Sequence, residues 1–425
     1  MRPASVDVGL TPTNWAGNYC YRAAKLHRPP NLEQVQEIIA NAPRLRVLGS
    51  RHSFNDIADS TELLSLDHLP SDVVVDRSTN TVSFSAALRY GELATRLHSE
   101  GVALPNLSSL PHISVAGAVA TATHGSGDAN GNLATAVAGL EMVTSSGEIL
   151  TASRGDADFN GLVVGLGALG AVTRITLDVE PTYQVRQRVF ERLAWEALEE
   201  NFDAITSCGY SVSVFTSWRR WIDQVWVKSR VTDAPEREHA AFFGATPAIV
   251  ERHPILGLDP VHCTQQLGVP GLWSDRLPHF RMGFTPSSGE ELQSEYIVPR
   301  HHTGDALREV RSLSDVIRPL LQISEIRTIA ADDLWMSPQY GQDTIAIHFT
   351  WLPKQKLVER AVAAIESALA PFGARPHWGK LFLAKAAAIS PLYERLPDFE
   401  KLVGRLDPRG AFCNDWLRQR VLNDR

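Results

Sequence analysis

One segment limits the folds open to this chain more than any other: a short strand-like run that breaks at a glycine and presents a histidine. Residues 44–54 read RLRVLGSRHSF, with Gly49 ending the run and His52 in the small, polar loop behind it. Such a loop has room for a large anionic ligand, and its imidazole could bond covalently to that ligand. An ordinary strand-to-turn connection with a surface histidine would look the same, so this segment alone leaves both interpretations open.

Length and composition describe an ordinary globular chain. Its 425 residues predict two or three domains, and 44% hydrophobic with 21% charged residues provide for a large core. The net charge is −7, and Lys and Arg are scattered, which argues against nucleic acid or an anionic membrane as the main partner. No apolar run is long enough to span a bilayer.

The cysteines and the first residues favour a cytoplasmic protein. The four cysteines lie far apart and form no C-x-x-C pair, which fits reduced thiols better than a disulfide framework or a zinc site. Residues 1–15, MRPASVDVGLTPTNW, lack the apolar core of a secretion signal. The cysteines are Cys20, Cys208, Cys263 and Cys413.

Helix and strand signals alternate in the first 180 residues. Asn31 is a good N-cap, and the apolar spacing behind it predicts a helix that starts at Leu32. Gly101 should stop a second helix. The predicted elements are strands at 44–48 and 172–179, hairpins at 73–84 and 140–151, and the second helix at 91–100.

After Pro181 the character of the chain changes, because strand-like segments rich in aromatics are separated by long polar connections such as 233–253. This pattern predicts a second domain built on an antiparallel sheet. The predicted elements are strands at 210–218, 224–228 and 292–298, and helices at 304–320 and 356–369.

Residues 113–127, ISVAGAVATATHGSG, have almost only small side chains. Glycines here let the backbone come close to a neighbour. A tightly packed core helix would explain the first half of the segment, but it would not need Thr121, Thr123, His124 and Ser126 together. Ligand contact is therefore the preferred interpretation.

Three familiar binding patterns match only in part: a nicotinamide site stays open as a weak alternative, a P-loop is discarded, and a metal site is disfavoured. Residues 165–170, GLGALG, match the dinucleotide fingerprint by letter, but the order is helix, glycines, strand, the reverse of a Rossmann site. GARPHWGK, residues 373–380, has the wrong spacing for a P-loop, and Leu381 replaces the required Ser or Thr. The His301-His302 pair lacks a third ligand at a suitable spacing, so no metal is expected.

Two strands of the second domain carry polar groups on one face. In residues 344–352, TIAIHFTWL, the apolar side chains alternate with Thr344, Ala346, His348 and Thr350. The apolar set should pack against helices, and the polar set would face a cavity. Glu325 and Arg327 are two residues apart and share a face in the same way. A solvated salt bridge or a solvated sheet face would explain these residues equally well.

Taken in order, these segments resemble the vanillyl-alcohol oxidase type of flavoprotein and, within it, the alditol oxidases, from Asn14 to the C-terminus. Any one segment is weak, but the ordered set is specific. The segments are TNWAGN (13–18), VLGSRHSFN (47–55), LPNLSSLPHISVAGAVATATHGSG (104–127), GALGAVT (167–173), EIRT, HFTW, RPHWGK and DPRGAF.

The resemblance implies an α+β fold of two domains. Residues 1–183 and 376–425 would form a vanillyl-alcohol oxidase-type (PCMH-like) FAD-binding domain, and residues 184–375 an antiparallel-sheet substrate or cap domain. In such proteins the histidine of the G-S-x-H-S segment bonds covalently to the flavin 8α-methyl group, which here is His52. Arg51 departs from the pattern, since glycine often precedes this histidine; its guanidinium could offset pyrophosphate charge or point outward. The residues that the resemblance places at FAD are Val47, Leu48, Gly49, Ser50, Arg51, His52, Ser53, Ser114, Gly117, Thr121, Ala122, Thr123, His124, Gly170, Val172 and His377.

The activity implied is oxidation of the terminal CH–OH of a polyol such as xylitol or sorbitol, with O₂ reduced to hydrogen peroxide. An open-chain polyol carries many hydroxyls, so burying it requires a matching set of donors and acceptors. Arg327 and Lys380 could stabilise charge on the reacting oxygen, with His348 or water as the base. The substrate residues implied are Ser109, Glu325, Arg327, Thr350 and Lys380. An aldonolactone oxidase or dehydrogenase of the same superfamily is the alternative, and a monomer is expected.

Overall fold

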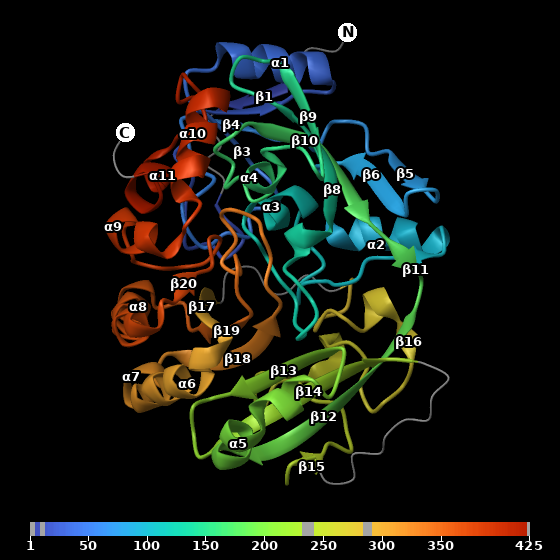
Figure 1. Ribbon diagram of the computed structural model, residues 1–425, viewed down its shortest axis with the longest axis vertical. Coiled ribbons are helices and arrows are strands. Elements are labelled where there is room, and N and C mark those ends of the chain that lie inside the picture. Colours follow the sequence, from blue (N-terminus) through green and yellow to red (C-terminus); the bar gives the residue numbers. More distant parts are fainter. Residues whose placement is uncertain (1–4, 9–12, 232–241, 284–290, 423–425) are drawn as a thin grey trace.

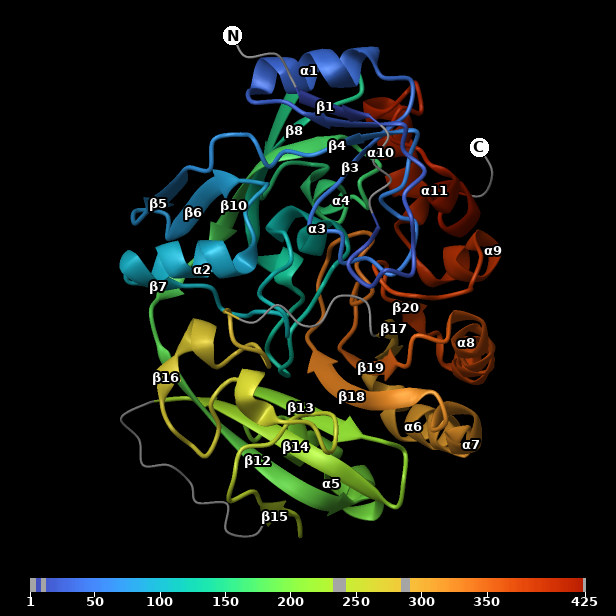
Figure 2. The ribbon, with the colours of Figure 1, turned by 180° about the vertical axis from the view of Figure 1, so that it is seen from behind.

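The strands of the molecule form two groups, one of smaller sheets and one that is a single large sheet. The large sheet is built from the second part of the chain. The structure is a computed structural model that describes residues 5–8, 13–231, 242–283 and 291–422. Two smaller sheets lie in the upper half of Figure 1, and a nine-stranded sheet lies below them. The view from behind shows the same two layers, with the helices that end the chain beside the upper half (Figure 2). The arrangement of mixed helices and antiparallel sheets in two domains confirms the predicted fold class.

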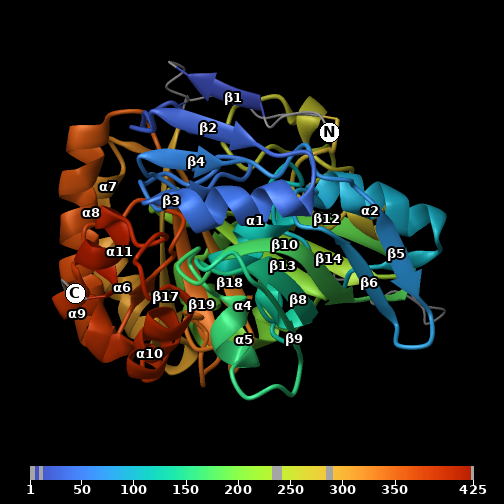
Figure 3. The same cartoon turned by 90° about the horizontal axis from the view of Figure 1, so that it is seen from above.

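The first sheet has four strands and carries the histidine loop. Its order is β1-β2-β4-β3, which Figure 3 shows as four neighbouring ribbons beside helix α1 (Leu32–Asn41). The β2–β4 and β4–β3 pairs are parallel. The strands are β1 (Ser5–Val8), β2 (Lys25–Arg28), β3 (Leu45–Val47) and β4 (Glu62–Leu64). Because β3 ends at Val47, residues 48–55 leave the sheet as a loop.

The second sheet has five strands in the order β5-β6-β10-β8-β9, all antiparallel. The strands are β5 (Val73–Asp76), β6 (Thr81–Ser85), β8 (Val137–Val143), β9 (Ile149–Ser153) and β10 (Ala171–Asp178). A short pair, β7 (Val102–Ala103) with β11 (Glu180–Pro181), lies where the chain passes to the larger sheet.

The nine-stranded sheet is antiparallel throughout and runs β15-β12-β14-β13-β18-β19-β17-β20, with β16 paired to β12. Its central strands are buried on both faces. The strands are β12 (Gln184–Ala194), β13 (Ser211–Thr216), β14 (Trp221–Arg230), β15 (Thr246–Pro247), β16 (Gly271–Leu272), β17 (Leu292–Pro299), β18 (Leu321–Ile329), β19 (Thr344–Trp351) and β20 (Arg375–Pro376).

Helices cover one face of the large sheet, as the alternation in β19 predicts. Ile347 and Phe349 share a buried apolar cluster with Val310 and Ile365 of the covering helices. The remaining helices are α2 (Tyr90–Ser99), α3 (Val115–Ala120), α4 (Phe159–Val163), α5 (Trp195–Thr206), α6 (Thr303–Ser312), α7 (Ser314–Ile317), α8 (Gln355–Leu369), α9 (Ala386–Ile389), α10 (Leu396–Leu406) and α11 (Asp415–Arg420). Short 3₁₀ turns lie at Leu133–Ala136, Pro260–His262, Trp273–Asp275, Arg300–His302, Ala370–Phe372 and Ser390–Leu392.

The end of the chain packs onto its beginning. Trp378, Phe399 and Leu417 belong to the same buried cluster as Leu93 and Ile175. Helices α9, α10 and α11 accordingly lie beside the upper sheets in Figures 1 and 2, far in sequence from the strands they contact.

Most of the local predictions are confirmed. Asn31 caps α1 by accepting a hydrogen bond from the Gln34 N–H (3.0 Å). Gly101, at φ +71°, follows the end of α2. The predicted hairpins are β5–β6 and β8–β9, and the order around GLGALG is helix α4, turn, strand β10. No described helix is long and apolar enough to cross a membrane.

One predicted helix is wrong in its extent, and several elements were not predicted. The helix expected at 304–320 is divided into α6 and α7 at Leu313. The Ser312 hydroxyl donates to the Glu309 carbonyl (2.7 Å). Such a local side-chain bond competes with the regular backbone hydrogen bonds of a helix. Strand β12 and helix α5 were not expected, and residues 233–241 of the predicted polar connection lie outside the described part of the chain.

Candidate functional site

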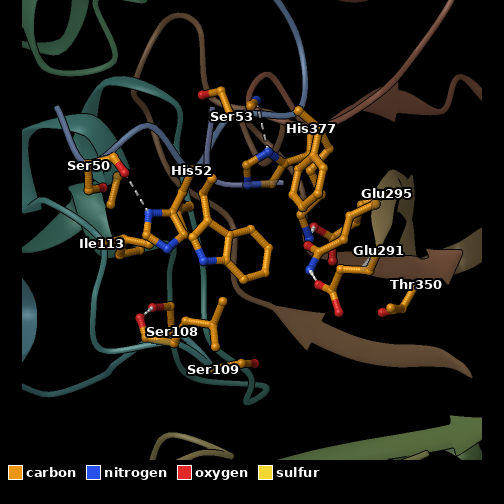
Figure 4. Close-up of a pocket in the computed structure, with 18 of the residues that line it drawn as sticks. Ser50, His52, Ser53, Ser108, Ser109, Ile113, Glu291, Glu295, Thr350 and His377 are labelled. Carbon is orange, nitrogen blue, oxygen red and sulfur yellow. Dashed lines mark hydrogen bonds and ion pairs between the residues drawn. The ribbon is translucent and has the colours of Figure 1, made fainter. Parts of the chain in front are cut away.

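A cavity of about 910 Å³ lies between the smaller sheets and the large sheet. One wall comes from the loop after β3 and from the small-residue segment around α3, and the other comes from β17, β18, β19 and residues 377–380. In Figure 4, His52 and Ser109 lie on one side of this pocket, and Glu295 and Thr350 lie on the other. The histidine loop and the small-residue segment therefore share one wall, and they face the polar strand faces that were predicted to line a cavity.

His52 is held with one ring nitrogen unpaired. Its Nδ1 lies 3.1 Å from the Ser50 carbonyl oxygen, and its ring stacks on Trp15 at 5.2 Å between centroids. Because a carbonyl only accepts hydrogen bonds, Nδ1 carries the proton and the lone pair is on Nε2. Nε2 is buried with no partner among the described residues. Burial lowers the pKa of His52 to about 4, so the imidazole is neutral at neutral pH.

The small residues bring backbone close to this loop. A Cβ on Gly49 would lie 2.6 Å from the Ser114 hydroxyl oxygen, and one on Gly117 would lie 2.8 Å from it. The Ser114 N–H donates to the Ser50 hydroxyl at 2.9 Å, which joins the loop after β3 to the start of α3. Backbone N–H groups and hydroxyls thus line the pocket wall where an anionic ligand would lie.

Arg51 has a left-handed backbone, with φ at +63°, which explains why glycine suits this position. Its side chain is exposed, and its guanidinium donates to the Thr13 carbonyl at 3.3 Å. The side chain therefore follows the outward alternative considered from the sequence.

Glu295, in β17, is the centre of charge on the opposite wall. Its side chain is fully buried, with one oxygen 2.6 Å from the Arg327 guanidinium and the other 2.7 Å from Lys380 Nζ. His124 Nε2 lies 3.4 Å from the same carboxylate. Burial alone would raise the pKa of Glu295, but Lys380, His124 and Arg327 hold it well below its usual range. The carboxylate is therefore charged and keeps two cations at the cavity wall.

Lys380 and His348 form a second part of this wall. Lys380 Nζ lies 2.8 Å from His348 Nδ1, and His348 Nε2 lies 3.1 Å from the Thr350 hydroxyl. An ammonium only donates, so His348 accepts at Nδ1 and carries its proton on Nε2. Burial, then Lys380, holds the pKa of His348 well below its usual range, and burial also lowers the pKa of Lys380. Arg327 stays charged, because Glu325 and Glu295 outweigh its burial and raise its pKa.

The loop that carries His52 is tied directly to the segment that carries Lys380. The Asn55 side-chain amide donates to the carbonyls of Trp378 (2.9 Å) and Lys380 (2.8 Å). The Phe54 N–H donates to the Gly379 carbonyl at 2.8 Å. Three hydrogen bonds therefore set the spacing between the histidine and the lysine.

His124, Glu295 and His377 are a cluster whose possible ligand atoms lie within 4.8 Å of one another. Arg327 and Lys380 already occupy both oxygens of Glu295, so a metal cation would face two fixed positive charges. The cluster fits ion pairing better than metal binding.

Most residues implied by the resemblance meet at the cavity. The lining includes Val47, Leu48, Gly49, Ser50, Arg51, His52, Ser53, Ser109, Ser114, Gly117, Thr121, Thr123, His124, Glu325, Arg327, His348, Thr350, His377 and Lys380. Ala122 is not part of this lining, and Gly170 and Val172 line a separate cavity of about 40 Å³. The cofactor and substrate roles of all these residues stay predictions.

Sequence reasoning missed Glu295 and a second buried group, Lys228 with His279. Glu295 is the single acid in the apolar run LQSEYIVP, and a charge buried in a strand is the signal that could have identified it. His279 contacts Glu325 at 2.8 Å and also lines the cavity.

Comparison with known proteins places this geometry in a family. The chain is 48% identical over 411 residues to the alditol oxidase of a Streptomyces species, covering 96% of this chain and 98% of the relative. The chain belongs to the alditol oxidase family. Residues 23–153 match the FAD binding domain family, and residues 288–420 match the D-arabinono-1,4-lactone oxidase family. The family is therefore one of FAD-dependent oxidoreductases in the vanillyl-alcohol oxidase superfamily.

More distant relatives share the fold. An L-gulono-1,4-lactone dehydrogenase of Mycobacterium tuberculosis is 28% identical, covering 96% of this chain and 98% of the relative. The crystal structure of a cholesterol oxidase from B. sterolicum superposes with a TM-score of 0.77, at 14% identity and 97% coverage of both chains. At that identity the likeness concerns the fold alone.

The residues present fit FAD. The cavity is large enough for a dinucleotide, the cradle at Gly49 and Gly117 excludes a side chain, and the unpaired Nε2 of His52 is a buried nucleophile.

Proposed function

We propose that the protein is an alditol oxidase, which oxidises the terminal hydroxyl of an open-chain polyol such as xylitol or sorbitol to the aldose. The observation that carries the proposal is the buried cluster of Lys380, Glu295 and Arg327 opposite His52, with Glu325 and Thr350 beside it. Such a wall supplies both donors and acceptors to a chain of hydroxyls. The 48% identity to an alditol oxidase over almost the whole chain supports the same substrate class.

The residues of the wall would divide the work of the reaction. FAD, when bound, supplies the acceptor for hydride and passes the electrons to O₂, which yields hydrogen peroxide. Glu325 and Thr350 accept and orient substrate hydroxyls, and Ser109 lies on the facing wall. Arg327 and Lys380 stabilise the negative charge that develops on the reacting oxygen as its proton leaves.

His348 is the proposed proton acceptor. In the structure its Nδ1 lone pair is engaged by Lys380. When Lys380 turns its N–H towards the reacting oxygen, Nδ1 becomes free to take the hydroxyl proton. Glu295 stays charged through this exchange and holds Lys380 at the site.

We further propose that FAD is bonded covalently through His52, with residues 1–183 and 376–425 as the cofactor domain and 184–375 as the substrate domain. The neutral imidazole and its unpaired nitrogen support the attachment. In His52→Ala, acid precipitation should release the flavin into the supernatant, whereas the wild-type pellet should stay yellow. Acid-stable flavin in the variant would place the attachment elsewhere.

We also propose a monomeric, cytoplasmic protein. The four cysteines are all unpaired in the structure, which fits a reducing compartment. Light scattering after size exclusion tests the oligomeric state.

The test of the main proposal is peroxide release with xylitol, sorbitol and L-gulono-1,4-lactone under one set of conditions. The alditol oxidase should favour the polyols. A clear preference for the lactone would support the second candidate, an aldonolactone oxidase or dehydrogenase. The match of residues 288–420 to the D-arabinono-1,4-lactone oxidase family favours that candidate, because this range holds β17, β18, β19 and Lys380.

A further inference from the structure

A buried lysine lies behind the substrate wall and has no part in the reaction described so far. Lys228, in β14, is 1% exposed. Its Nζ donates to the carbonyls of Leu277 and Pro278 and lies 3.2 Å from His279 Nδ1. An ammonium has three protons, and each of them has one acceptor here.

Lys228 determines which nitrogen of His279 carries the proton. Because Lys228 donates to Nδ1, the ring proton lies on Nε2, 2.8 Å from a Glu325 carboxylate oxygen. Phe215 and Trp226 hold the imidazole edge-on, with centroids at 5.4 Å and 5.3 Å. The ring is therefore fixed in position and in tautomer, and it donates to one oxygen of Glu325.

The hydrogen-bonded chain crosses the sheet towards the cavity. Lys228 is on β14 and Glu325 on β18, with β13 between them. The backbone N–H of His279 donates to the Ser109 carbonyl at 3.2 Å, so the same residue contacts both walls. The second oxygen of Glu325 forms an ion pair with the Arg327 guanidinium, whose Nε lies 3.6 Å away.

We propose that Lys228 and His279 are positioning residues that hold Glu325 as an ionised, oriented acceptor for a substrate hydroxyl. The inference rests on the proposed polyol oxidation. Neither residue would touch the reacting carbon, and each acts through the Glu325 carboxylate.

The arrangement predicts a pH signature. Burial lowers the pKa of Lys228 to about 7, and the charged or titratable groups around it are His279, Glu325, Arg327 and Cys263. A neutral amine has two N–H groups and one lone pair. With two carbonyls taking the N–H groups, its lone pair faces Nδ1 and favours the opposite tautomer of His279. Glu325 then loses its donor, so polyol affinity should fall as the pH rises through about 7.

The deciding experiment is a double-mutant cycle on the flavin-loaded enzyme. Anaerobic stopped-flow reduction by xylitol gives its Kd and the limiting rate of flavin bleaching separately. His279→Phe should raise the Kd about tenfold with little change in the limiting rate, the loss expected for one hydrogen bond to a charged group. When His279→Phe is added to Glu325→Ala, the Kd should stay within about twofold of that of the Glu325→Ala single variant, because no carboxylate remains to be positioned.

Three further variants separate positioning from packing. His279→Gln keeps an acceptor for Lys228 and a donor for Glu325, so it should restore most of the affinity and remove the pH dependence. Lys228→Met should also abolish the pH dependence. Thr344→Val is the control, because the Thr344 hydroxyl is buried in the same sheet and bonds the Ile329 carbonyl (3.3 Å), away from Lys228, His279 and Glu325.

Equal effects of His279→Phe with and without the Glu325 carboxylate would overturn the inference, as would an equal loss of affinity in Thr344→Val. A wild-type enzyme that xylitol does not bleach would instead overturn the proposed function itself. The two failures are thus distinguishable.

Discussion

Glu295→Gln is the perturbation whose size the structure determines best. The side chain keeps its shape, but the carboxylate that pairs with Arg327 and Lys380 is lost. Lys380 can release its proton, since burial already lowers its pKa, whereas Arg327 cannot. Arg327 then loses its closer carboxylate and keeps only Glu325, 3.6 Å from its Nε. Removing one partner of a buried ion pair destabilises a fold by about 3–5 kcal/mol.

That loss corresponds to a fall in Tm of about 6–20 °C, since 1 kcal/mol shifts Tm by about 2–4 °C in a domain of about 150–250 residues. Differential scanning calorimetry of the flavin-loaded protein at pH 7 measures it. Asp398→Asn is the matched control, because Asp398 also pairs with two cations, Arg395 and Lys401, but on the surface. The control should melt with the wild type.

The pH dependence of the difference checks the cause. The folded pKa of Glu295 lies well below the ordinary value of 4.5, so its ionised form stabilises the fold above that pH. This stabilisation is lost as the pH falls from 4.5 towards the folded pKa. The Tm gap between wild type and E295Q should therefore be full at pH 7 and shrink in acid. A variant that melts with the wild type at pH 7 would refute the assignment of Glu295 as the centre of charge.

Three other outcomes follow from the site. Lys380→Met should lower the limiting rate of flavin reduction by about 100- to 1,000-fold in stopped flow, the effect of losing one donor to a developing oxyanion; normal kinetics would remove Lys380 from the chemistry. Gly49→Ala should lower the flavin-to-protein absorbance ratio, because its Cβ would lie 2.6 Å from the Ser114 hydroxyl; full flavin content would show that the cradle can widen. Arg51→Gly should keep acid-stable flavin in the precipitated pellet, because the side chain is exposed and only its backbone is constrained; released flavin would give the guanidinium a role in attachment.

The sequence predicts those parts of the site that are written in contiguous residues. The loop around His52 and the small-residue segment before Gly127 carry their own signals, because a close backbone approach requires glycine and a strand that ends needs polar residues behind it. The alternation in β19 likewise shows that His348 and Thr350 share one face.

Glu295 shows why the rest could not be predicted. Its partners Arg327 and Lys380 are 32 and 85 residues away. Arg327 reaches it through the pairing of β18 and β19 with β17, and Lys380 through the pairing of β20 with the other edge of β17. Sheet register between distant strands is a tertiary property that no local pattern records. Lys228 and His279 were not predicted for the same reason. In addition, a lysine in a strand is ordinarily at the surface, so the sequence gives no signal that Lys228 is buried.

The hydrogen bonds from Phe54 and Asn55 to residues 378–380 have a consequence for redesign. They connect the loop that carries His52 to the segment that carries Lys380. The groups that would bind the rest of the substrate project from β18 and β19. Exchanging Glu325 or Thr350 on those two strands should change which molecules are accepted and leave the distance between His52 and Lys380 untouched. Selectivity can thereby be altered by mutation without rebuilding the reactive centre, provided that Arg327 and His348 on the same strands are kept.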